Sequence, residues 1–295
     1  MTLTIFTPVY NRKELLIKLY RSLREQTCKQ FVWSIVDDGS TDNLKELVDS
    51  FAKESDFSIK YFYQENGGKH SAHNKGVELC ETDLFICVDS DDTLTKNAVE
   101  RILEVAQVSK NQKLLGFFFR KADTNGNISG GAFTLKNSII GLRDLYHKTD
   151  FKGELAIVLY TNLIKDFKFP IFENEKFVSE LVLYNRLNSI AKMLWVNEVI
   201  YIFEYQESGY TKNSVKLIAK NPYGVACGYL SEAYYSTSFF DKIKNYSRFK
   251  AMVSVFELNE QKYVKRNINI FIKVCYLAFL KHYIKLFSSI KKAYY

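Results

Sequence analysis

Three carboxylates stand within four residues at Asp89-Ser90-Asp91-Asp92, directly after the apolar run Leu84–Val88. Carboxylates this close repel each other unless a cation neutralises them, and Mg²⁺ takes carboxylate oxygens together with substrate phosphates. An Asp-x-Asp turn can place one carboxylate on a ribose and the other on a metal that bridges a diphosphate. The bland alternative is an acidic loop that caps the next helix. The first interpretation predicts a nucleotide and metal site at Asp89, Ser90 and Asp91.

Two further polar clusters follow apolar runs nearer the N-terminus. Asp38, in Asp37-Asp38-Gly39-Ser40, can accept from the N–H of a pyrimidine base, or can simply belong to a turn with a helix cap. The other cluster is Thr7–Asn11, which follows the first apolar run. There Pro8 restricts the backbone, and Tyr10 offers a ring on which a base can stack. A strand end is the alternative there. We predict that Pro8, Tyr10 and Asp38 face a nucleotide.

A glycine pair, Gly67-Gly68, opens a stretch that continues through Lys69 to Gly76. Glycines let the backbone approach phosphate, the N-terminus of a helix favours an anion, and Lys69 adds a positive charge. The stretch is neither a Walker A nor a dinucleotide motif, so its phosphate signal is weak. His70 and His73 have no third metal ligand nearby in sequence, which argues against a metal there.

These clusters need a scaffold, and the first 120 residues alternate short apolar runs with amphipathic stretches. The expected strands are Leu3–Pro8, Phe31–Val36, Ile59–Tyr63, Leu84–Val88 and Leu114–Phe119. The expected helices between them are Arg12–Gln26, Thr41 or Asp42 to Lys53, Gly68 to about Cys80, and Thr95–Val108. Such alternation predicts an α/β fold with a mostly parallel sheet flanked by helices. Ligands bind such sheets beyond the carboxyl ends of the strands, where the polar clusters stand.

The pattern changes after Arg120. We expect a hairpin turn at Thr124–Asn127, helices over Ser138–His147 and Phe177–Leu187, strands over Glu154–Leu159 and Met193–Tyr205, and long helices from Pro222. A general base for a sugar hydroxyl needs a positioned carboxylate. Spacing alone does not choose among Glu173, Glu175 and Glu180.

The net charge of +8 over 295 residues is unevenly distributed. Twelve basic and two acidic residues lie between Lys242 and Tyr295, which puts +10 on the last 54 residues and leaves −2 on the rest. A uniformly basic nucleic-acid binder is therefore not expected, and neither is a nucleic-acid partner. An apolar helical face in this tail predicts an amphipathic helix on an anionic membrane surface. Its members are Ile268, Ile272, Cys275, Tyr276, Phe279, Tyr283, Leu286 and Ile290. A helix packed on the body with solvated lysines is the alternative.

Five cysteines, odd in number and without a CxxC pair, are expected to be reduced. No signal peptide is recognised at the N-terminus, and no apolar run reaches the roughly 20 residues that span a bilayer. We therefore expect a cytoplasmic protein, peripheral at the inner face of the cell membrane if the basic tail binds there.

Four motifs, in this order and spacing, resemble the catalytic domain of glycosyltransferase family 2, the inverting nucleotide-sugar transferases of GT-A fold. They are Thr7–Asn11, Val36–Asp42, Asn66–Gly76 and Asp89–Asp92. The resemblance covers residues 2–120 strongly and 160–213 more loosely. The stretch Gly67–Asn74 looks like a bacterial subgroup linked to capsule and other surface polysaccharides. That subgroup also carries stretches similar to Glu175–Glu180 and Glu204–Thr211.

The resemblance implies roles for the donor-side residues. Asp38 would bind the base, with uracil expected, and Tyr10 would lie near it. Asp89 would meet the ribose, and Asp91 would hold Mg²⁺ or Mn²⁺ on the diphosphate. Lys69 and Asn74 would help to hold the nucleotide.

On the acceptor side, the resemblance favours Glu180 as the catalytic base. Many relatives read Glu-Asp here with the Asp as base, whereas Leu181 follows Glu180 in this chain. Glu175 therefore stays open as an alternative base. His73 stands where many relatives have Arg.

Together these observations predict an inverting, metal-dependent glycosyltransferase that moves a sugar from a UDP-sugar to a saccharide or lipid-linked oligosaccharide. Residues 1–213 would form the GT-A catalytic domain and residues 214–295 a basic helical region. A nucleotidyltransferase acting on sugar phosphates is one alternative, although Thr7–Arg12 lacks the Gly-rich basic signature expected of it. A non-catalytic protein that binds nucleotide sugars is the other.

Overall fold

The computed structural model describes residues 1–133, 135, 138–204, 214–263 and 276–294. Contacts divide the chain into two compact units. The first comprises Met1–Lys168 and Leu187–Tyr205, and the second comprises Phe169–Arg186 and Gln206–Tyr295. The predicted division into a catalytic domain and a basic region at residue 213 rests on sequence texture and stays a prediction.

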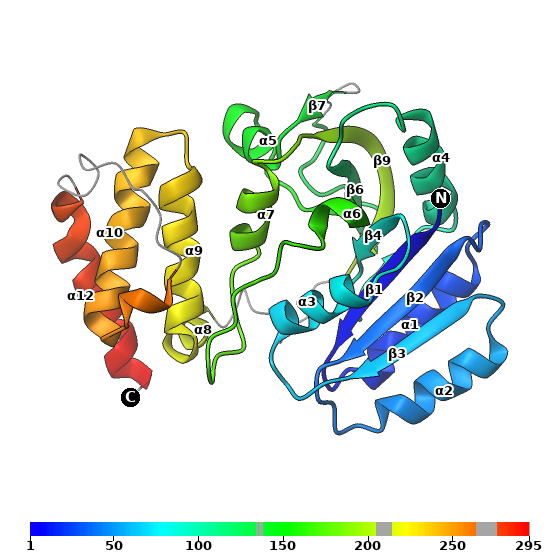
Figure 1. Ribbon diagram of the computed structural model, residues 1–295, viewed down its shortest axis with the longest axis horizontal. Coiled ribbons are helices and arrows are strands. Elements are labelled where there is room, and N and C mark those ends of the chain that lie inside the picture. Colours follow the sequence, from blue (N-terminus) through cyan, green and yellow to red (C-terminus); the bar gives the residue numbers. More distant parts are fainter. Residues whose placement is uncertain (134, 136–137, 205–213, 264–275, 295) are drawn as a thin grey trace. The chain divides into compact units, whose positions relative to one another are not determined.

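The first unit begins with the expected alternation of strands and helices (Figure 1). The strands are β1 (Leu3–Val9), β2 (Phe31–Asp37), β3 (Ser58–Tyr63) and β4 (Leu84–Cys87). The helices are α1 (Lys13–Arg24), α2 (Leu44–Glu54), α3 (Lys69–Leu79) and α4 (Ala98–Val108). The helix predicted from Thr41 or Asp42 begins later, at Leu44, because Asn43 precedes it in the left-handed conformation with φ 59°.

The second half of the first unit completes the sheet. Its strands are β5 (Thr93–Leu94), β6 (Gly116–Asp123), β7 (Ile139–Ile140), β8 (Leu155–Tyr160) and β9 (Met193–Phe203). Two short helices, α5 (Leu142–Lys148) and α6 (Thr161–Ile164), lie between them. The helix predicted over Ser138–His147 is shorter than expected, because Ile139 and Ile140 pair with β9 as a strand. The turn predicted at Thr124–Asn127 is present, with the amide of Gly126 donating to the carbonyl of Asp123.

The strand order is β3-β2-β1-β4-β8-β6-β9-β5, with β7 paired to β9. Strands β3, β2, β1 and β4 are mutually parallel, whereas β8 runs antiparallel to both β4 and β6. The predicted fold class is confirmed, but the sheet is mixed rather than nearly all parallel. All the predicted nucleotide-binding clusters follow strands of the parallel half, so the antiparallel half does not disturb them.

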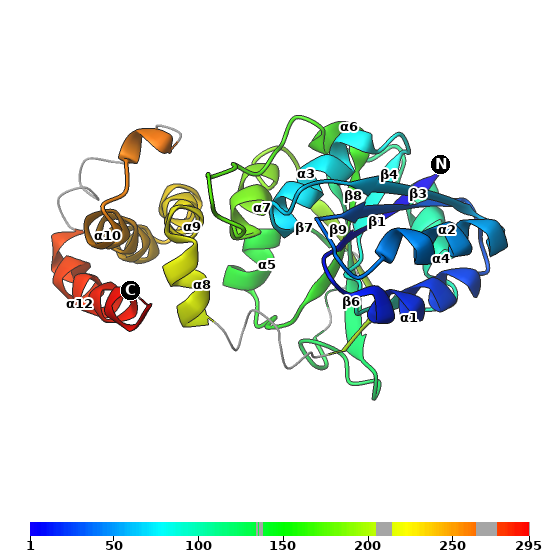
Figure 2. The ribbon, with the colours of Figure 1, turned by 90° about the horizontal axis from the view of Figure 1, so that it is seen from below.

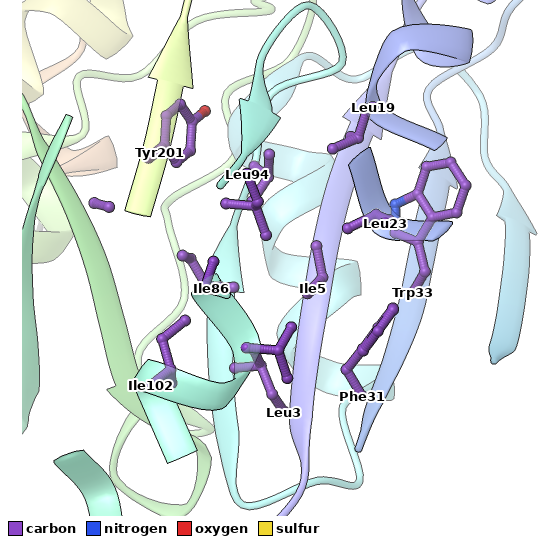
Figure 3. Packing of buried hydrophobic residues seen from close by; sticks show 14 of the residues in the cluster. Leu3, Ile5, Leu19, Leu23, Phe31, Trp33, Ile86, Leu94, Ile102 and Tyr201 are labelled. Atoms are coloured by element: carbon purple, nitrogen blue, oxygen red, sulfur yellow. The ribbon is translucent and has the colours of Figure 1, made fainter. Parts of the chain in front are cut away.

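The core lies where α1, α2 and α4 pack against one face of the sheet, while α3 covers the other face (Figure 2). Apolar side chains three or four residues apart turn one face of α1 inward. Figure 3 shows Leu19 and Leu23 of α1 and Ile102 of α4 among side chains of β1, β2 and β4. Trp33 is fully buried there, and its indole N–H donates to the hydroxyl of Thr7 at 3.0 Å. This packing fixes the strand ends that carry the polar clusters.

The second unit is helical. It contains α7 (Leu181–Leu187), α8 (Ser214–Lys220), α9 (Pro222–Tyr235), α10 (Phe239–Phe256), the 3-10 turn η1 (Glu260–Lys262) and α12 (Leu277–Tyr294). Helix α7 is four residues shorter at its start than the predicted Phe177–Leu187. The predicted helices from Pro222 onward are confirmed where the structure describes them.

The basic helix α12 packs on its neighbours. Tyr283, Phe287 and Ile290 are buried, the Phe287 ring lies 6.1 Å from the ring of Tyr229 in α9, and the guanidinium of Arg248 in α10 lies over Tyr283. Much of the apolar face predicted to meet lipid is therefore used inside the helical unit. The predicted members Ile268, Ile272 and Cys275 lie outside the described residues. In the described part of the chain, no helix is both long and apolar enough to cross a membrane.

Candidate active site

The loops after β1 and β2 are tied together at the carboxyl ends of the strands. The side-chain oxygen of Asn11 accepts from the amide of Thr41 at 2.7 Å, and the amide of Asn11 donates to the hydroxyl of Ser40 at 3.0 Å. A carboxylate oxygen of Asp42 accepts from the amide of Lys13 at 2.9 Å, at the start of α1. The side chain of Asn11 thus bonds to the neighbouring loop rather than to the first turn of α1.

Tyr10 stands on this rim with its ring half exposed, at 49%. Pro8 lies in β1 opposite Val36 of β2 and is partly buried. A solvated ring beside a rigid strand end is a surface on which a flat base can stack. The placement of Pro8 and Tyr10 is compatible with their predicted role, which no contact in the structure tests.

The two carboxylates after β2 hold the rim in shape. Asp37 is buried and accepts from the amide of Ser40 at 2.7 Å and from the hydroxyl of Tyr61 at 2.5 Å. Asp38 is also buried and accepts from the amides of Gly67 at 2.9 Å and Gly68 at 2.7 Å. Asp38 thereby ties the turn after β2 to the glycine pair that precedes α3.

The backbone beside Asp38 allows this close approach only with glycine. Gly39 has φ 84°, a conformation that favours glycine, and a Cβ there would lie 2.8 Å from the amide nitrogen of Asn66. The turn after β2 and the loop after β3 thus lie against each other. The side-chain amide of Gln64 also donates to Asp38 at 2.7 Å.

The acidic turn after β4 meets two cations. The ammonium of Lys69 lies 2.9 and 3.0 Å from the two carboxylate oxygens of Asp89, and Arg12 donates to Asp91 at 2.8 Å. Burial raises the pKa of Asp89, but the positive charges of Lys69, Lys121 and Arg12 outweigh it, so the pKa lies below its ordinary value. Asp89 is therefore ionised at neutral pH.

The third carboxylate of the turn, Asp92, accepts hydrogen bonds from β9 and the residue that follows it. Asp92 is buried, accepting from the hydroxyl of Tyr201 at 2.7 Å and from the amide of Glu204 at 3.1 Å. The same hydroxyl accepts from the amide of Asp89 at 3.1 Å. Burial raises the pKa of Asp92 to about 6. Asp92 anchors the acidic turn to β9, and Ser90 beside it is buried too.

Tyr201, Lys121 and Arg12 were not singled out from the sequence. The ammonium of Lys121 lies 4.0 Å from the centre of the Tyr201 ring, beneath the acidic turn. Tyr201 and Lys121 lie in strands far along the chain, and no local pattern links them to Asp89. Arg12 does follow the Tyr10-Asn11 cluster directly, so a cation next to a strand end was a signal that could have been read.

The carboxylates of this rim fit a metal only in part. Among the residues that the structure describes, no group of three or more His, Cys, Asp and Glu side chains is arranged to hold an ion. Mg²⁺ bound with a diphosphate uses only one or two protein carboxylates, and the substrate supplies further oxygens. Asp91, alone or with Asp89, fits that requirement, whereas Asp92 is occupied by β9.

Helix α3 carries the remaining residues of the glycine stretch. Asn74 lies in α3, partly buried. Burial lowers the pKa of His70 to about 4, so this side chain is neutral. The ring of His73 packs edge-on against Phe6 and Phe85 at 5.8 and 5.5 Å between centroids. Both histidines thus lie in the packing of α3 rather than on the rim.

The candidate bases lie in the second unit. Glu175 is buried and accepts from the amides of Tyr223 and Gly224, each at 2.7 Å. Its carboxylate therefore caps the N-terminus of α9, and burial raises its pKa. Glu180 is exposed and stands directly before α7. Glu173 is exposed as well. The similar stretch Glu204–Thr211 lies outside the described residues beyond Glu204.

The cysteines that the structure describes, Cys28, Cys80, Cys87 and Cys227, carry free thiols. Their reduced state in the cell stays a prediction. Cys275 lies outside the described residues.

The model of glycosyl transferase family 2 matches residues 4–161, more than half of the chain. The chain therefore belongs to glycosyl transferase family 2, and its fold is the GT-A fold.

Two proteins similar to this chain are bacterial. The chain is 26% identical to Glycosyltransferase GlyG of Streptococcus pneumoniae, over 68% of this chain and 70% of that protein. It is 28% identical to GalNAc(5)-diNAcBac-PP-undecaprenol beta-1,3-glucosyltransferase of Campylobacter jejuni, over 78% of this chain and 72% of that protein. Among solved structures, S. aureus TarS 1-349 in complex with UDP-GlcNAc matches with a TM-score of 0.64 at 16% identity, covering 100% of this chain and 91% of that one.

Proposed function

We propose that this protein is an inverting glycosyltransferase that transfers a sugar from a UDP-sugar to a saccharide or lipid-linked oligosaccharide in bacterial surface polysaccharide synthesis. Membership of glycosyl transferase family 2 supports the transfer of sugars. One observation supports the proposed binding of the nucleotide-sugar donor. Polar side chains gather on the rim at the carboxyl ends of the parallel strands, namely Asp38, Lys69, Asp89 and Asp91. Ligands of parallel sheets bind beyond the carboxyl ends of the strands, where this rim lies.

The donor would bind along the rim. Asp38 would accept from the base, and Tyr10, with Pro8 behind it, would stack on it. Asp89 would meet the ribose, with the buried Ser90 fixing the turn. Lys69 and Asn74, from the first turns of α3, would hold the nucleotide.

Asp91 would hold Mg²⁺ or Mn²⁺ on the diphosphate. A bound divalent cation would supply the positive charge that stabilises the departing diphosphate. The Arg12 guanidinium lies 2.8 Å from the Asp91 carboxylate, so a metal that binds Asp91 would take the place of Arg12 there.

Glu180 would act as the general base. Its carboxylate would take the proton of the acceptor hydroxyl, the oxygen would attack the anomeric carbon, and the bond to the diphosphate would break with inversion. The capping role of Glu175 supports Glu180 over its buried neighbour, because both carboxylate oxygens of Glu175 already accept backbone hydrogen bonds.

The acceptor is proposed from relatives and from charge. The relative from Campylobacter jejuni is named for an undecaprenol-linked substrate. Lys281, Lys285 and Lys292 of α12 are exposed on the helical unit. A basic surface of this kind is attracted to anionic lipid, at about 1 kcal/mol per Lys near the membrane. It would bring the enzyme to a membrane that carries the acceptor.

A donor screen that measures UDP release with and without acceptor tests the proposal. We expect release from one UDP-sugar that rises when a saccharide or lipid-linked acceptor is added, and a product of inverted anomeric configuration by NMR. Pyrophosphate formation in place of UDP would identify a nucleotidyltransferase. Donor binding with no turnover under any acceptor would identify a protein that only binds nucleotide sugars.

A further inference from the structure

The acid Glu180 stands in a segment that helix α9 holds from two sides. We propose that α9 is a positioning element for Glu180, so that part of the C-terminal helical region belongs to the catalytic apparatus. The inference rests on the proposed role of Glu180 as base. All the contacts that carry it lie inside the second unit.

The first hold is a reciprocal cap at the start of α9. Glu175 accepts from the amides of Tyr223 and Gly224, each at 2.7 Å. In the opposite direction, the side-chain oxygen of Asn221 accepts from the amide of Lys176 at 2.7 Å. Three hydrogen bonds thus tie residues 175 and 176 to the start of α9, and the two that end on the Glu175 carboxylate are charge-assisted.

The second hold is a close contact along one face of α9. A Cβ at Gly224 would overlap the carbonyl oxygen of Phe177, and a Cβ at Gly228 would lie 3.2 Å from the Cβ of Ser179. These glycines are four residues apart and therefore lie on the same face of the helix. The carbonyl group of Phe177 and the side chains of Val178 and Ser179 consequently lie directly against α9.

The third hold follows Glu180. The side-chain amide of Asn185 in α7 donates to Glu232 at 2.6 Å and to the hydroxyl of Ser231 at 3.3 Å, both in α9. Glu180 is thus exposed on a backbone that is anchored to α9 on both sides. A base works only within a few tenths of an ångström of its proper position, and anchoring of this kind supplies it.

The experiment is a double-mutant cycle of Gly224→Ala with Glu180→Gln in the full chain. Alanine favours a helix more than glycine does, so any loss in Gly224→Ala comes from the overlap with Phe177. We expect Gly224→Ala to lower kcat roughly 10- to 100-fold while the KM for the donor and the Kd for UDP stay unchanged. In the Glu180→Gln background, the same substitution should lower the residual rate by less than about two-fold, because the base is already lost.

Two matched variants keep the test sharp if Gly224→Ala folds poorly. Gly228→Ala needs only a small shift of Ser179 and should lower kcat less, with normal far-UV circular dichroism. Tyr234→Ala, at the exposed far end of α9, should leave transfer unchanged.

The outcomes separate the two ideas. Full transfer in Glu180→Gln alone would overturn the assignment of the base, and with it the proposed role of Glu180. A different result would overturn only the positioning role of α9. In that case Glu180→Gln loses transfer, and Gly224→Ala lowers the rate by the same factor whether or not Glu180 is present. The assignment of Glu180 as the base would then stand.

Discussion

Arg12 and Asp91 form an ion pair, 2.8 Å between guanidinium nitrogen and carboxylate oxygen, with only 12% of the Asp91 side chain exposed. The carboxylate proposed to bind the metal is therefore neutralised by a side chain of the protein itself. The position that a metal ion would compensate already carries a positive charge. A metal that binds Asp91 would therefore compete with Arg12 when no nucleotide is bound.

We predict that Arg12→Gln binds Mn²⁺ more tightly than the wild type in the absence of UDP, by about three- to ten-fold. A partly buried ion pair of this kind is worth about 1 kcal/mol, which the metal no longer has to replace. Titration followed by electron paramagnetic resonance measures the affinity. Arg21→Gln, on the exposed side of α1, is the control and should bind Mn²⁺ as the wild type does. Equal or weaker binding in Arg12→Gln would refute the competition.

Asp91→Asn should abolish metal-dependent turnover of the donor. We expect the rate to fall by about 100-fold or more, because a metal stabilises transition-state charge by several kcal/mol. UDP release at several Mn²⁺ concentrations measures it. Asp49→Asn, which removes a carboxylate paired with Lys45 on the surface, is the control. An unchanged rate in Asp91→Asn would remove the metal assignment.

Glu180→Gln should bind UDP normally and lose transfer by about 10²- to 10⁴-fold, the range that a general base contributes. Calorimetry with UDP and a product assay measure the two effects separately. Glu173→Gln, an exposed acid in the same segment, should keep full transfer. If Glu173→Gln loses transfer and Glu180→Gln does not, the base lies at residue 173.

Stability should depend on pH through His70. Its pKa is lowered by burial to about 4 in the folded chain, whereas the unfolded chain binds the proton near pH 6.5. The unfolded state therefore holds more protons between these values, so stability is fully present above pH 6.5 and falls by roughly 2–3 kcal/mol as the pH drops toward 4. Chemical denaturation at pH 7 and pH 5 measures this. His70→Leu should show a weaker loss, while the exposed His282→Leu should behave as the wild type.

Exchange of Lys281, Lys285 and Lys292 for Gln should weaken binding to vesicles that contain anionic lipid by roughly ten-fold or more. Point substitutions are better than deleting the tail, because α12 also packs on α9 and α10. Lys45, Lys53 and Lys113, three exposed lysines of the first unit, make a control of equal charge change. Undiminished sedimentation with the vesicles would contradict membrane binding by α12.

Local patterns predicted the first half of the fold well. The spacing and number of apolar residues predicted the bounds of β1 to β4 to within one or two residues of those in the structure. They could do so because buried parallel strands appear in the sequence as continuous apolar runs. The mixed half was harder, because nothing local reveals that β8 runs antiparallel between β4 and β6. Helix α7 was predicted too long, since apolar spacing at Phe177 and Val178 cannot register the backbone of α9 lying against it.

The sequence by itself determined the alternation of strands and helices, the rim position of Asp38, Asp89 and Asp91, and the basic character of the tail. Each of these follows from residues close together in the chain. The tertiary structure decided which carboxylates form hydrogen bonds or ion pairs with other parts of the protein. Asp92 is engaged by Tyr201 from 109 positions away, Asp91 by Arg12 from 79, and Glu175 by α9 from about 48. Partners this distant in sequence meet only through folding, because hydrogen bonds and ion pairs depend on spatial distance and leave no local pattern in the chain.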